Sequence, residues 1–240
     1  MGIELEFIAR VRSPYVEKFA IPRQPGLAPG IRSRIELIGE YAQADCLQGL
    51  EQCSHIWLQF IFHESQDTPW RPKVRPPRLG GNRSMGVFAT RSPVRPNPIG
   101  LSVAKIESID LQNPAIEVSG LDLLDQTPIL DIKPYVPYAD AITAAHNDFA
   151  TEPPAKLDVS FSVHAANVLE NLADDSLKEI ITQLLAQDPR PAYQRGQTSD
   201  REYGVKLRSL LLEESFNIRW VYRLTENGLE QINVFSIERI

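Results

Sequence analysis

Residues 68–100 concentrate cationic side chains and prolines in a chain that is acidic overall. The segment contains seven of the 19 prolines and no acidic residue, and its seven cationic residues are Arg71, Lys73, Arg75, Arg78, Arg83, Arg91 and Arg95. Because the formal net charge of the whole chain is −6, this basic patch predicts one specific anionic partner and argues against general coating of nucleic acid. A solvated loop without a partner is the alternative, but the prolines remove flexibility that such a loop could keep.

The end of this segment, FATRSPVRPNPIGLS at residues 88–102, is expected to be rigid. Three prolines and two arginines lie between Arg91 and Pro98. Proline fixes φ and removes a backbone donor, and Pro98 favours an extended backbone at Asn97. We therefore expect the loop to aim the Asn97 amide and the Arg95 guanidinium in fixed directions, as a loop that holds a ligand requires.

Two further loops carry side chains that can bind a polar ligand. In KFAIPRQPGLAPG, residues 18–30, prolines and glycine predict an extended turn that presents Arg23 and Gln24. The loop at residues 119–135 contains Asp122, Asp125, Asp131, Lys133 and Tyr135. Because carboxylates are costly to bury without partners, they could accept hydrogen bonds from the hydroxyl or ammonium groups of a ligand. Caps of turns in a barrel loop are the alternative.

Several common catalytic and metal sites have no counterpart in the sequence. It contains no GxxxxGK[ST], GxSxG or HExxH motif, and the glycine-rich stretch LGGNRSMG is not a GxGxxG that follows a strand. Cys46 and Cys53 lie too far apart for a zinc knuckle, and the four histidines are scattered. We expect no metal, and we expect the two thiols to be buried on one face of a short helix.

The elements that must position these loops are mostly short strands. Apolar patterns predict strands at 3–11, 33–39, 56–62, 85–90, 99–110, 115–123 and 127–135, and a short helix at 44–55. The strand at 56–62 is expected to be fully buried. Short strands separated by turn signals, without regular intervening helices, favour an all-β barrel over a βαβ fold.

The C-terminal part has a different pattern. A stretch rich in Ala, Thr and Asn, with a Pro-Pro pair, predicts a linker at 143–155 between domains at 1–142 and 156–240. Apolar residues at helical spacing predict a helix in SLKEIITQLLAQD, and its Ser176 and Glu179 resemble a capping box. Asn227-Gly228 predicts the turn of a hairpin. The predicted fold class is α+β, mainly β, with a small N-terminal β-barrel and a smaller α+β C-terminal domain.

The sequence shows no signal for a membrane or for export. No apolar run approaches the roughly 20 residues of a membrane span. The first residues lack a positively charged region followed by an apolar core, which a signal peptide would have. We therefore expect a cytoplasmic protein.

Four segments in order resemble the TrmO (YaeB/TsaA-type) family of S-adenosylmethionine-dependent tRNA methyltransferases. They are IPRQPG, RPPRLGGN, GVFATRSPVRPNPIGLS and LDLLDQTPILDIKPY. The resemblance covers most of residues 5–140 and continues more weakly into DPRPAYQ and the C-terminal hairpin. It implies a β-barrel catalytic domain and a homodimer with the cofactor site near the subunit interface. It also implies methylation of N6 of N6-threonylcarbamoyladenosine (t6A) at position 37 of tRNA for threonine, which gives m6t6A.

The resemblance implies cofactor and tRNA contacts at matched positions. S-adenosylmethionine contacts are expected at Gln24, Pro25, Gly26, His63, Glu64, Arg91, Leu101, Leu121, Asp122, Leu123, Leu124, Asp125 and Thr127. Contacts to the tRNA anticodon loop are expected at Arg71, Lys73, Arg75, Arg78, Arg95, Asn97, Lys133 and Tyr135, with Tyr135 stacking on the flipped-out base, and the C-terminal domain is expected to help recognise tRNA. The family usually has glycine where this chain has Gln126, so we expect a positive φ at this non-glycine residue.

Methyl transfer to N6 requires that the N6 proton leave, and a carboxylate or an ordered water can accept it. Asp125 and Asp131 are the predicted proton acceptors, and structural capping is the alternative for each. Two other classes of function stay open. One is a non-catalytic module that senses an adenosyl ligand, and the other is a methyltransferase that acts on a small molecule.

Overall fold

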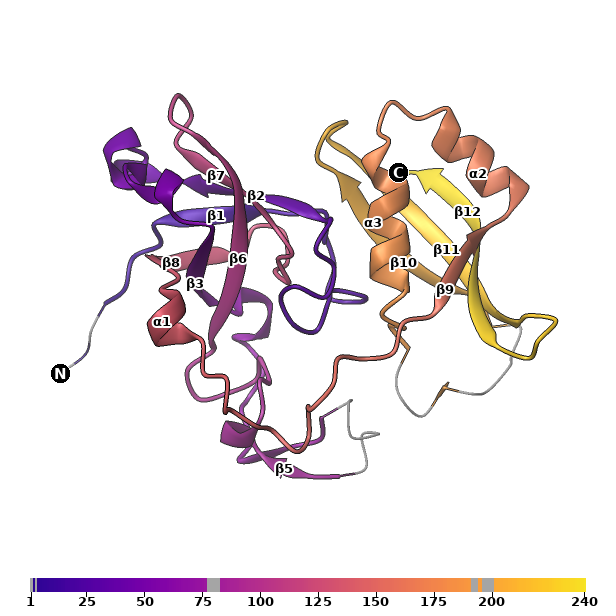
Figure 1. Cartoon of the computed structure of the whole chain (residues 1–240), viewed down its shortest axis with the longest axis horizontal. Helices are drawn as coiled ribbons and strands as arrows, with labels where there is room; N and C mark the ends of the chain where they lie inside the picture. Colours follow the sequence, from indigo (N-terminus) through magenta and orange to yellow (C-terminus); the bar gives the residue numbers. More distant parts are fainter. Residues whose placement is uncertain (1, 3, 77–82, 191–193, 196–200) are drawn as a thin grey trace.

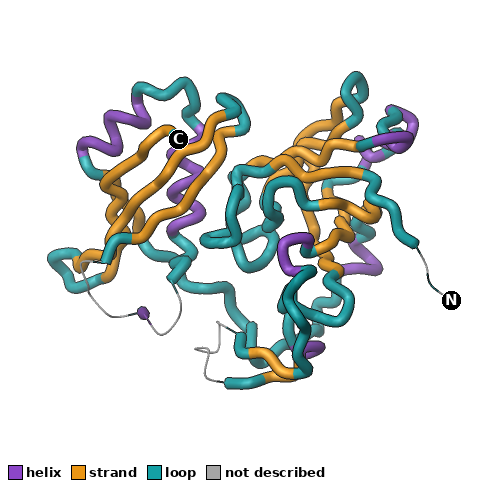
Figure 2. The backbone as a smooth tube through the Cα atoms, turned by 180° about the vertical axis from the view of Figure 1, so that it is seen from behind, coloured by secondary structure: helices purple, strands orange, loops and turns teal. Residues whose placement is uncertain are grey.

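Two lobes lie side by side in the computed structural model, which describes residues 2, 4–76, 83–190, 194–195 and 201–240 (Figures 1 and 2). The N-terminal lobe is a closed barrel with the strand order β1-β2-β7-β6-β3-β8. Its strands are β1 (Ala9–Arg12), β2 (Arg32–Leu37), β3 (His55–Ile61), β6 (Ile99–Asp110), β7 (Ala115–Ser119) and β8 (Pro128–Pro134). Among the described residues, no helix has the length and apolar character needed to cross a membrane.

The barrel has an apolar interior because its strands alternate inward and outward side chains. On β3, Ile56, Leu58 and Phe60 are buried in the core, whereas the residues between them are half-buried on the outside. The prediction that this strand is fully buried was therefore wrong. An antiparallel barrel strand buries one of its two faces, and continuous apolar character in the sequence does not reveal which residues face outward.

Two other expectations for the barrel need correction. The strand predicted at 3–11 begins only at Ala9, because its pairing with both neighbouring strands, β2 and β8, starts at this residue. The predicted helix at 44–55 is instead two short 3₁₀ turns, η2 (Ala44–Leu47) and η3 (Leu50–Gln52), with Gly49 at a φ of +92° between them. Another 3₁₀ turn, η1 (Gly39–Tyr41), precedes them. Cys46 is exposed and Cys53 is half-buried, so the thiols do not share a buried helix face.

A long excursion leaves the barrel between β3 and β6 and forms the lower part of Figure 1. It contains η4 (His63–Ser65), β4 (Lys73–Val74), β5 (Met85–Gly86) and η6 (Val87–Ala89). The strand predicted at 85–90 is thus limited to its first two residues. After β8, α1 (Pro137–Asp140) leads into an extended connection to the second lobe.

The second lobe is a four-stranded sheet with two helices. Its elements are β9 (Asp158–Phe161), α2 (Val163–Glu170), α3 (Ser176–Leu185), β10 (Tyr203–Ser209), β11 (Glu214–Leu224) and β12 (Glu230–Arg239), with the strand order β10-β11-β12-β9. The predicted helix and hairpin are confirmed, and Gly228 in the turn has a φ of +74°. The capping box does not form, because Asp174 accepts hydrogen bonds from the backbone N–H and the hydroxyl of Ser176 at 3.0 and 2.5 Å.

Segment 13–31, between β1 and β2, joins the two lobes. Its Tyr15, Ala28 and Ile31 are buried in the same apolar cluster as α3 and the β10–β12 sheet. The side chain of Gln187 donates a hydrogen bond to the Leu27 carbonyl at 2.8 Å. The chain that carries the RQPG turn is therefore packed into the core of the second lobe.

Candidate functional site

The RQPG turn meets two other predicted loops at one end of the barrel. Arg91 donates a hydrogen bond to the side-chain oxygen of Gln24. The backbone N–H of Gly26 donates to the Gly120 carbonyl at 2.8 Å, and a Cβ on Gly120 would lie 3.4 Å from the Gly26 Cα. A Cβ on Gly26 would meet nothing within 4 Å, so the backbone of the turn is open to a ligand while its other side is held. Pro25 of the same turn is half-buried.

The loop from Leu121 to Asp125 alternates between the core and the site. Leu121 and Leu123 are buried in the barrel core, whereas the Asp122 carboxylate accepts a hydrogen bond from the Ser102 hydroxyl at 2.7 Å. Burial raises the pKa of Asp122 to about 6, although the Ser102 hydrogen bond and the charge of Arg91 favour the ionised form. The site thus contains a desolvated carboxyl group beside a guanidinium.

Tyr15 adds a polar group that the sequence analysis did not identify. Its side chain is 1% exposed, and no group among the described residues hydrogen-bonds its hydroxyl. Burial and the nearby charge of Asp122 both raise the pKa of this hydroxyl. A buried hydroxyl without a partner costs about 1–3 kcal/mol, which a polar atom of a ligand could recover.

A hollow of about 590 Å³ gathers other predicted cofactor residues. It is lined by Val16, Glu17, Lys18, His63, Glu64, Leu124, Asp125 and Gln126. Burial lowers the pKa of His63, and the charges of Lys18 and Arg10 lower it further, although Glu64 opposes them. The imidazole is therefore neutral at pH 7.

Asp125 occupies a junction between the lobes. Its carboxylate accepts a hydrogen bond from the backbone N–H of Ser13 at 3.0 Å and lies 3.9 Å from Arg12 and 3.8 Å from Arg208 of β10. These are the contacts expected of a structural cap. The next turn is closed by Thr127, whose hydroxyl donates to the Leu124 carbonyl at 2.7 Å. The expected positive φ at Gln126 is confirmed, with a value of +63°.

A third group of predicted residues lies on the outer face of the barrel, across β6, β3 and β8. Leu101 and Asp131 are both cross-strand partners of Gln59. Asp131 forms an ion pair with Lys133 at 2.6 Å. The centroid of the Tyr135 ring lies 5.6 Å from that of the Trp57 ring on β3. Leu101 is not among the residues that line the hollow.

The basic segment presents some of its predicted tRNA contacts to solvent. Arg71, Lys73, Arg75 and Asn97 are exposed. The guanidinium of Arg95 instead donates to the carbonyls of Thr90 and Ser92 at 3.2 and 3.5 Å, so it braces its own loop. Arg78 lies outside the described residues. No group of three or more His, Cys, Asp or Glu residues in the described part of the chain is arranged to hold a metal ion.

Comparison with known proteins agrees with the resemblance. The family model of the tRNA-methyltransferase O N-terminal domain matches residues 10–141, and that of the TrmO C-terminal domain matches residues 154–240. The chain is 44% identical to the tRNA (adenine(37)-N6)-methyltransferase of Escherichia coli over 99% of this chain and 98% of that protein. A Pseudomonas aeruginosa relative, 49% identical over 90% of both chains, is classed by its name among S-adenosylmethionine-dependent methyltransferases.

A crystal structure of TrmO from Pseudomonas aeruginosa superimposes with a TM-score of 0.77 at 39% identity, covering 99% of this chain and 98% of that one. The agreement extends over both lobes of the molecule. The chain therefore belongs to the TrmO family, the tRNA-methyltransferase O family.

Proposed function

We propose that this protein uses S-adenosylmethionine to methylate N6 of adenosine 37 in tRNA, and that the substrate nucleoside is t6A in tRNA for threonine, which becomes m6t6A. The observation that carries the proposal is the convergence of three distant segments at one end of the barrel. Gln24 bonds to Arg91, Gly26 bonds to Gly120, and Asp122 lies beside both loops. The 44% identity to a tRNA (adenine(37)-N6)-methyltransferase supports the same activity.

The groups at this end of the barrel fit S-adenosylmethionine, which supplies a methyl group on a cationic sulfur. The Arg91 guanidinium can bind the carboxylate of the amino acid part. The Asp122 carboxylate can balance a positive charge, and the Tyr15 hydroxyl offers an unused polar contact. The open backbone at Gly26 allows a ligand to approach closely.

This chain's residues would act mainly by positioning, because holding two reactants in line can contribute about 7–11 kcal/mol. Asp125 and Asp131 stay our predicted proton acceptors, although each carboxylate already contacts protein partners. Asp122 is a third candidate. With a pKa of about 6, it is mostly ionised at pH 7 yet can still take up a proton.

Exposed cations and aromatic groups support binding of the anticodon loop. Arg71, Lys73 and Arg75 of the excursion can contact phosphates, and Tyr135 beside Lys133 can stack on a base. The C-terminal domain would help to recognise tRNA. The two family-model matches support the proposed division into domains at 1–142 and 156–240 with a linker at 143–155, and we place the reaction in the cytoplasm.

We also propose a homodimer. Large apolar side chains of the excursion and of the outer barrel face are exposed, including Phe88 at 79% and Leu101 at 53%. Ile99 is exposed beside Leu101 on the same outward row of β6. Burying such a row against a second copy would give Leu101 a place in a cofactor pocket, which the single chain does not provide.

The proposal is tested by nucleoside mass spectrometry of tRNA from cells with and without the protein. We expect loss of m6t6A and accumulation of t6A when the protein is absent. With purified protein, tRNA that carries t6A should be methylated and the same tRNA with unmodified adenosine 37 should not. An unchanged nucleoside profile together with cofactor binding would instead indicate a sensor of adenosyl ligands.

The activity of a methyltransferase that acts on a small molecule should not depend on the cations of the basic segment. Neutralising Arg71, Lys73 and Arg75 would then leave activity unchanged, whereas the tRNA proposal predicts a higher KM. Removal of the C-terminal domain is a poor discriminator, because it would also expose Tyr15 and Ile31 of the segment that carries the RQPG turn.

A further inference from the structure

The sheet of the C-terminal domain has one covered face and one uncovered face. Helices α2 and α3 lie against one side of the strands (Figures 1 and 2). Val205, Leu207, Phe216, Ile218 and Trp220 point to that side and are buried in one cluster with α3. Because side chains alternate along a strand, the residues between them form the opposite face.

The uncovered face is polar and carries four cations from two neighbouring strands. Its residues on the hairpin and the preceding strand include Lys206, Arg208, Asn217, Arg219, Val221, Arg223, Gln231 and Asn233. Lys206 lies directly opposite Asn217, and Arg219 lies opposite Gly204. Carboxylates lie on the same face: Glu238 is directly opposite Asn217, Asp158 of β9 is opposite Gln231, and Glu202 pairs with Arg219 at 3.8 Å.

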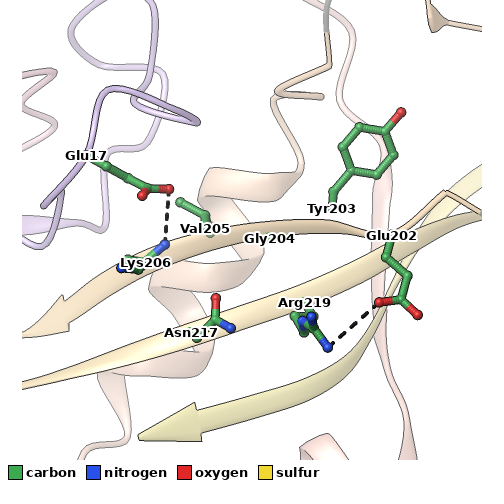
Figure 3. A pocket seen from close by; sticks show the side chains of 8 residues that line it. All are labelled: Glu17, Glu202, Tyr203, Gly204, Val205, Lys206, Asn217 and Arg219. Atoms are coloured by element: carbon green, nitrogen blue, oxygen red, sulfur yellow. Dashed lines mark hydrogen bonds and ion pairs between the residues drawn. The ribbon is translucent and has the colours of Figure 1, made fainter. Parts of the chain in front are cut away.

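A hollow of about 290 Å³ opens on this face (Figure 3). Lys206, Asn217 and Arg219 reach it from β10 and β11, and Glu17 reaches it from the loop of the barrel lobe. Glu17 also lines the larger hollow that contains His63, and its carboxylate accepts a hydrogen bond from the backbone N–H of Lys206 at 3.3 Å. The hollow on the uncovered face and the hollow that contains His63 therefore share one wall residue, Glu17.

We propose that this uncovered face binds the phosphodiester backbone of the stem next to the anticodon loop, while the loop itself enters the site between the lobes. The inference rests on the proposed function, and it assigns the contact to one face of the C-terminal sheet. Arginine, lysine, asparagine and glutamine side chains are the usual donors to phosphate and ribose oxygens. A duplex RNA is read mainly through its shape, phosphates and 2′-hydroxyls, so the contact would orient the tRNA without reading bases.

The composition of this face favours RNA over a protein partner. Protein interfaces have an apolar, charge-poor centre, whereas this face is polar throughout, with Arg219 and Arg223 on the inner strand β11 and Lys206 on the edge strand β10. The exposed ion pair of Arg219 with Glu202 contributes little in water. A phosphate can therefore replace the carboxylate with little loss.

The test compares two double variants of the full-length protein. Arg219→Gln/Arg223→Gln removes two cations from the uncovered face. Lys156→Gln/Lys178→Gln removes two exposed cations elsewhere, one of them on α3. Fluorescence anisotropy with tRNA measures affinity as a function of salt, and steady-state kinetics separate KM from kcat. Arg208 is left unchanged because it lies 3.8 Å from Asp125.

We expect the magnitude of the salt slope to fall by about 2 in the first variant, roughly one for each phosphate contact. The KM for tRNA should rise, while cofactor affinity and kcat at saturating tRNA stay unchanged. The second variant, and a charge-retaining Arg219→Lys/Arg223→Lys variant, should keep the wild-type slope.

The inference is overturned if wild-type protein methylates tRNA and the Arg219→Gln/Arg223→Gln variant has the same slope and KM. It is also overturned if that variant changes only the sedimentation of the protein or its capture of a protein partner. Failure of the proposed function is a separate result, because wild-type protein would then methylate no tRNA at all.

Discussion

Asp122→Asn should raise the stability of the folded protein at neutral pH and weaken its binding of S-adenosylmethionine. The wild-type carboxyl has a pKa of about 6 in the folded protein, against an ordinary value of 3.8, so the folded state holds this proton more tightly than the unfolded state. The stability that comes from the protonated form is complete below about pH 4 and is lost as pH rises through 6. A shift of about 2 units corresponds to roughly 3 kcal/mol lost at pH 7.

Asparagine has no charge to desolvate and can still accept the hydrogen bond from Ser102. The variant should therefore exceed the wild type by as much as about 3 kcal/mol at pH 7.5 and by less than about 1 kcal/mol at pH 4. Urea unfolding at both pH values measures the difference. Ser102→Ala is the comparison variant, because it keeps the carboxyl but removes a hydrogen bond that favours its ionised form. The pKa of Asp122 should then rise further, so this variant should lose at least as much stability as the wild type between pH 4 and pH 7.5.

An equal stability difference at both pH values would refute the reasoning. At pH 4 the carboxyl of Asp122 is already neutral, so replacing it with asparagine removes no buried charge and should add little stability. The functional consequence is testable in the same variant. A cation bound beside Asp122 would lower the pKa of its carboxyl, so binding of S-adenosylmethionine to the wild type should release protons near pH 6. Calorimetry in buffers of different ionisation enthalpy detects that release, and the Asn variant should show neither the release nor wild-type affinity.

Three further substitutions test packing in the barrel, in the loop between β7 and β8, and in the C-terminal lobe. Gly100→Ala should destabilise the barrel by about 1–3 kcal/mol in thermal unfolding, because its Cβ would overlap the Phe60 ring, whereas Gly86→Ala has no atom within 4 Å and should change little. Gln126→Gly should raise stability by up to about 1 kcal/mol, because glycine adopts the φ of +63° without steric cost. Arg190→Ala should cost about 3–5 kcal/mol in urea unfolding, because it leaves two carboxylates without their buried partner; a loss below 1 kcal/mol would contradict that role.

Local signals account for the parts of the fold that the sequence predicted well. The alternation in 99–110 matches β6, and the apolar spacing in 176–185 matches α3, because each element buries one face against its own neighbours. Neither β9 nor α2 was predicted. β9 has four residues, and its pairing with β12 is parallel, so its partner is distant in the sequence. Such a strand is determined by tertiary contacts and leaves little periodic pattern.

The candidate site also has residues that the sequence indicated and residues that only the folded structure reveals. The proline and arginine patterns indicated the loops and their cations, and the family resemblance supplied the cofactor residues that we propose. No local pattern marks Tyr15, because its burial comes from the C-terminal lobe and the charge that raises the pKa of its hydroxyl belongs to the distant residue Asp122. The structural contacts of Asp125 and Arg95 were equally invisible, since each depends on which backbone groups the fold brings to the side chain.

Segment 13–31 links the packing of the C-terminal domain to the proposed cofactor site. Burial of a large side chain contributes about 1.5–3 kcal/mol, so Tyr15 and Ile31 alone bind the segment to the second lobe with several kcal/mol of apolar burial. The same segment carries Gln24, which bonds to Arg91. If an RNA stem bound to the C-terminal sheet shifted that sheet, the shift would therefore reach the turn that we propose to contact the cofactor. Recognition of the tRNA body and formation of the cofactor pocket would then both depend on the packing of segment 13–31. Substitutions on the uncovered face leave this packing intact, so they should weaken tRNA binding without weakening cofactor binding.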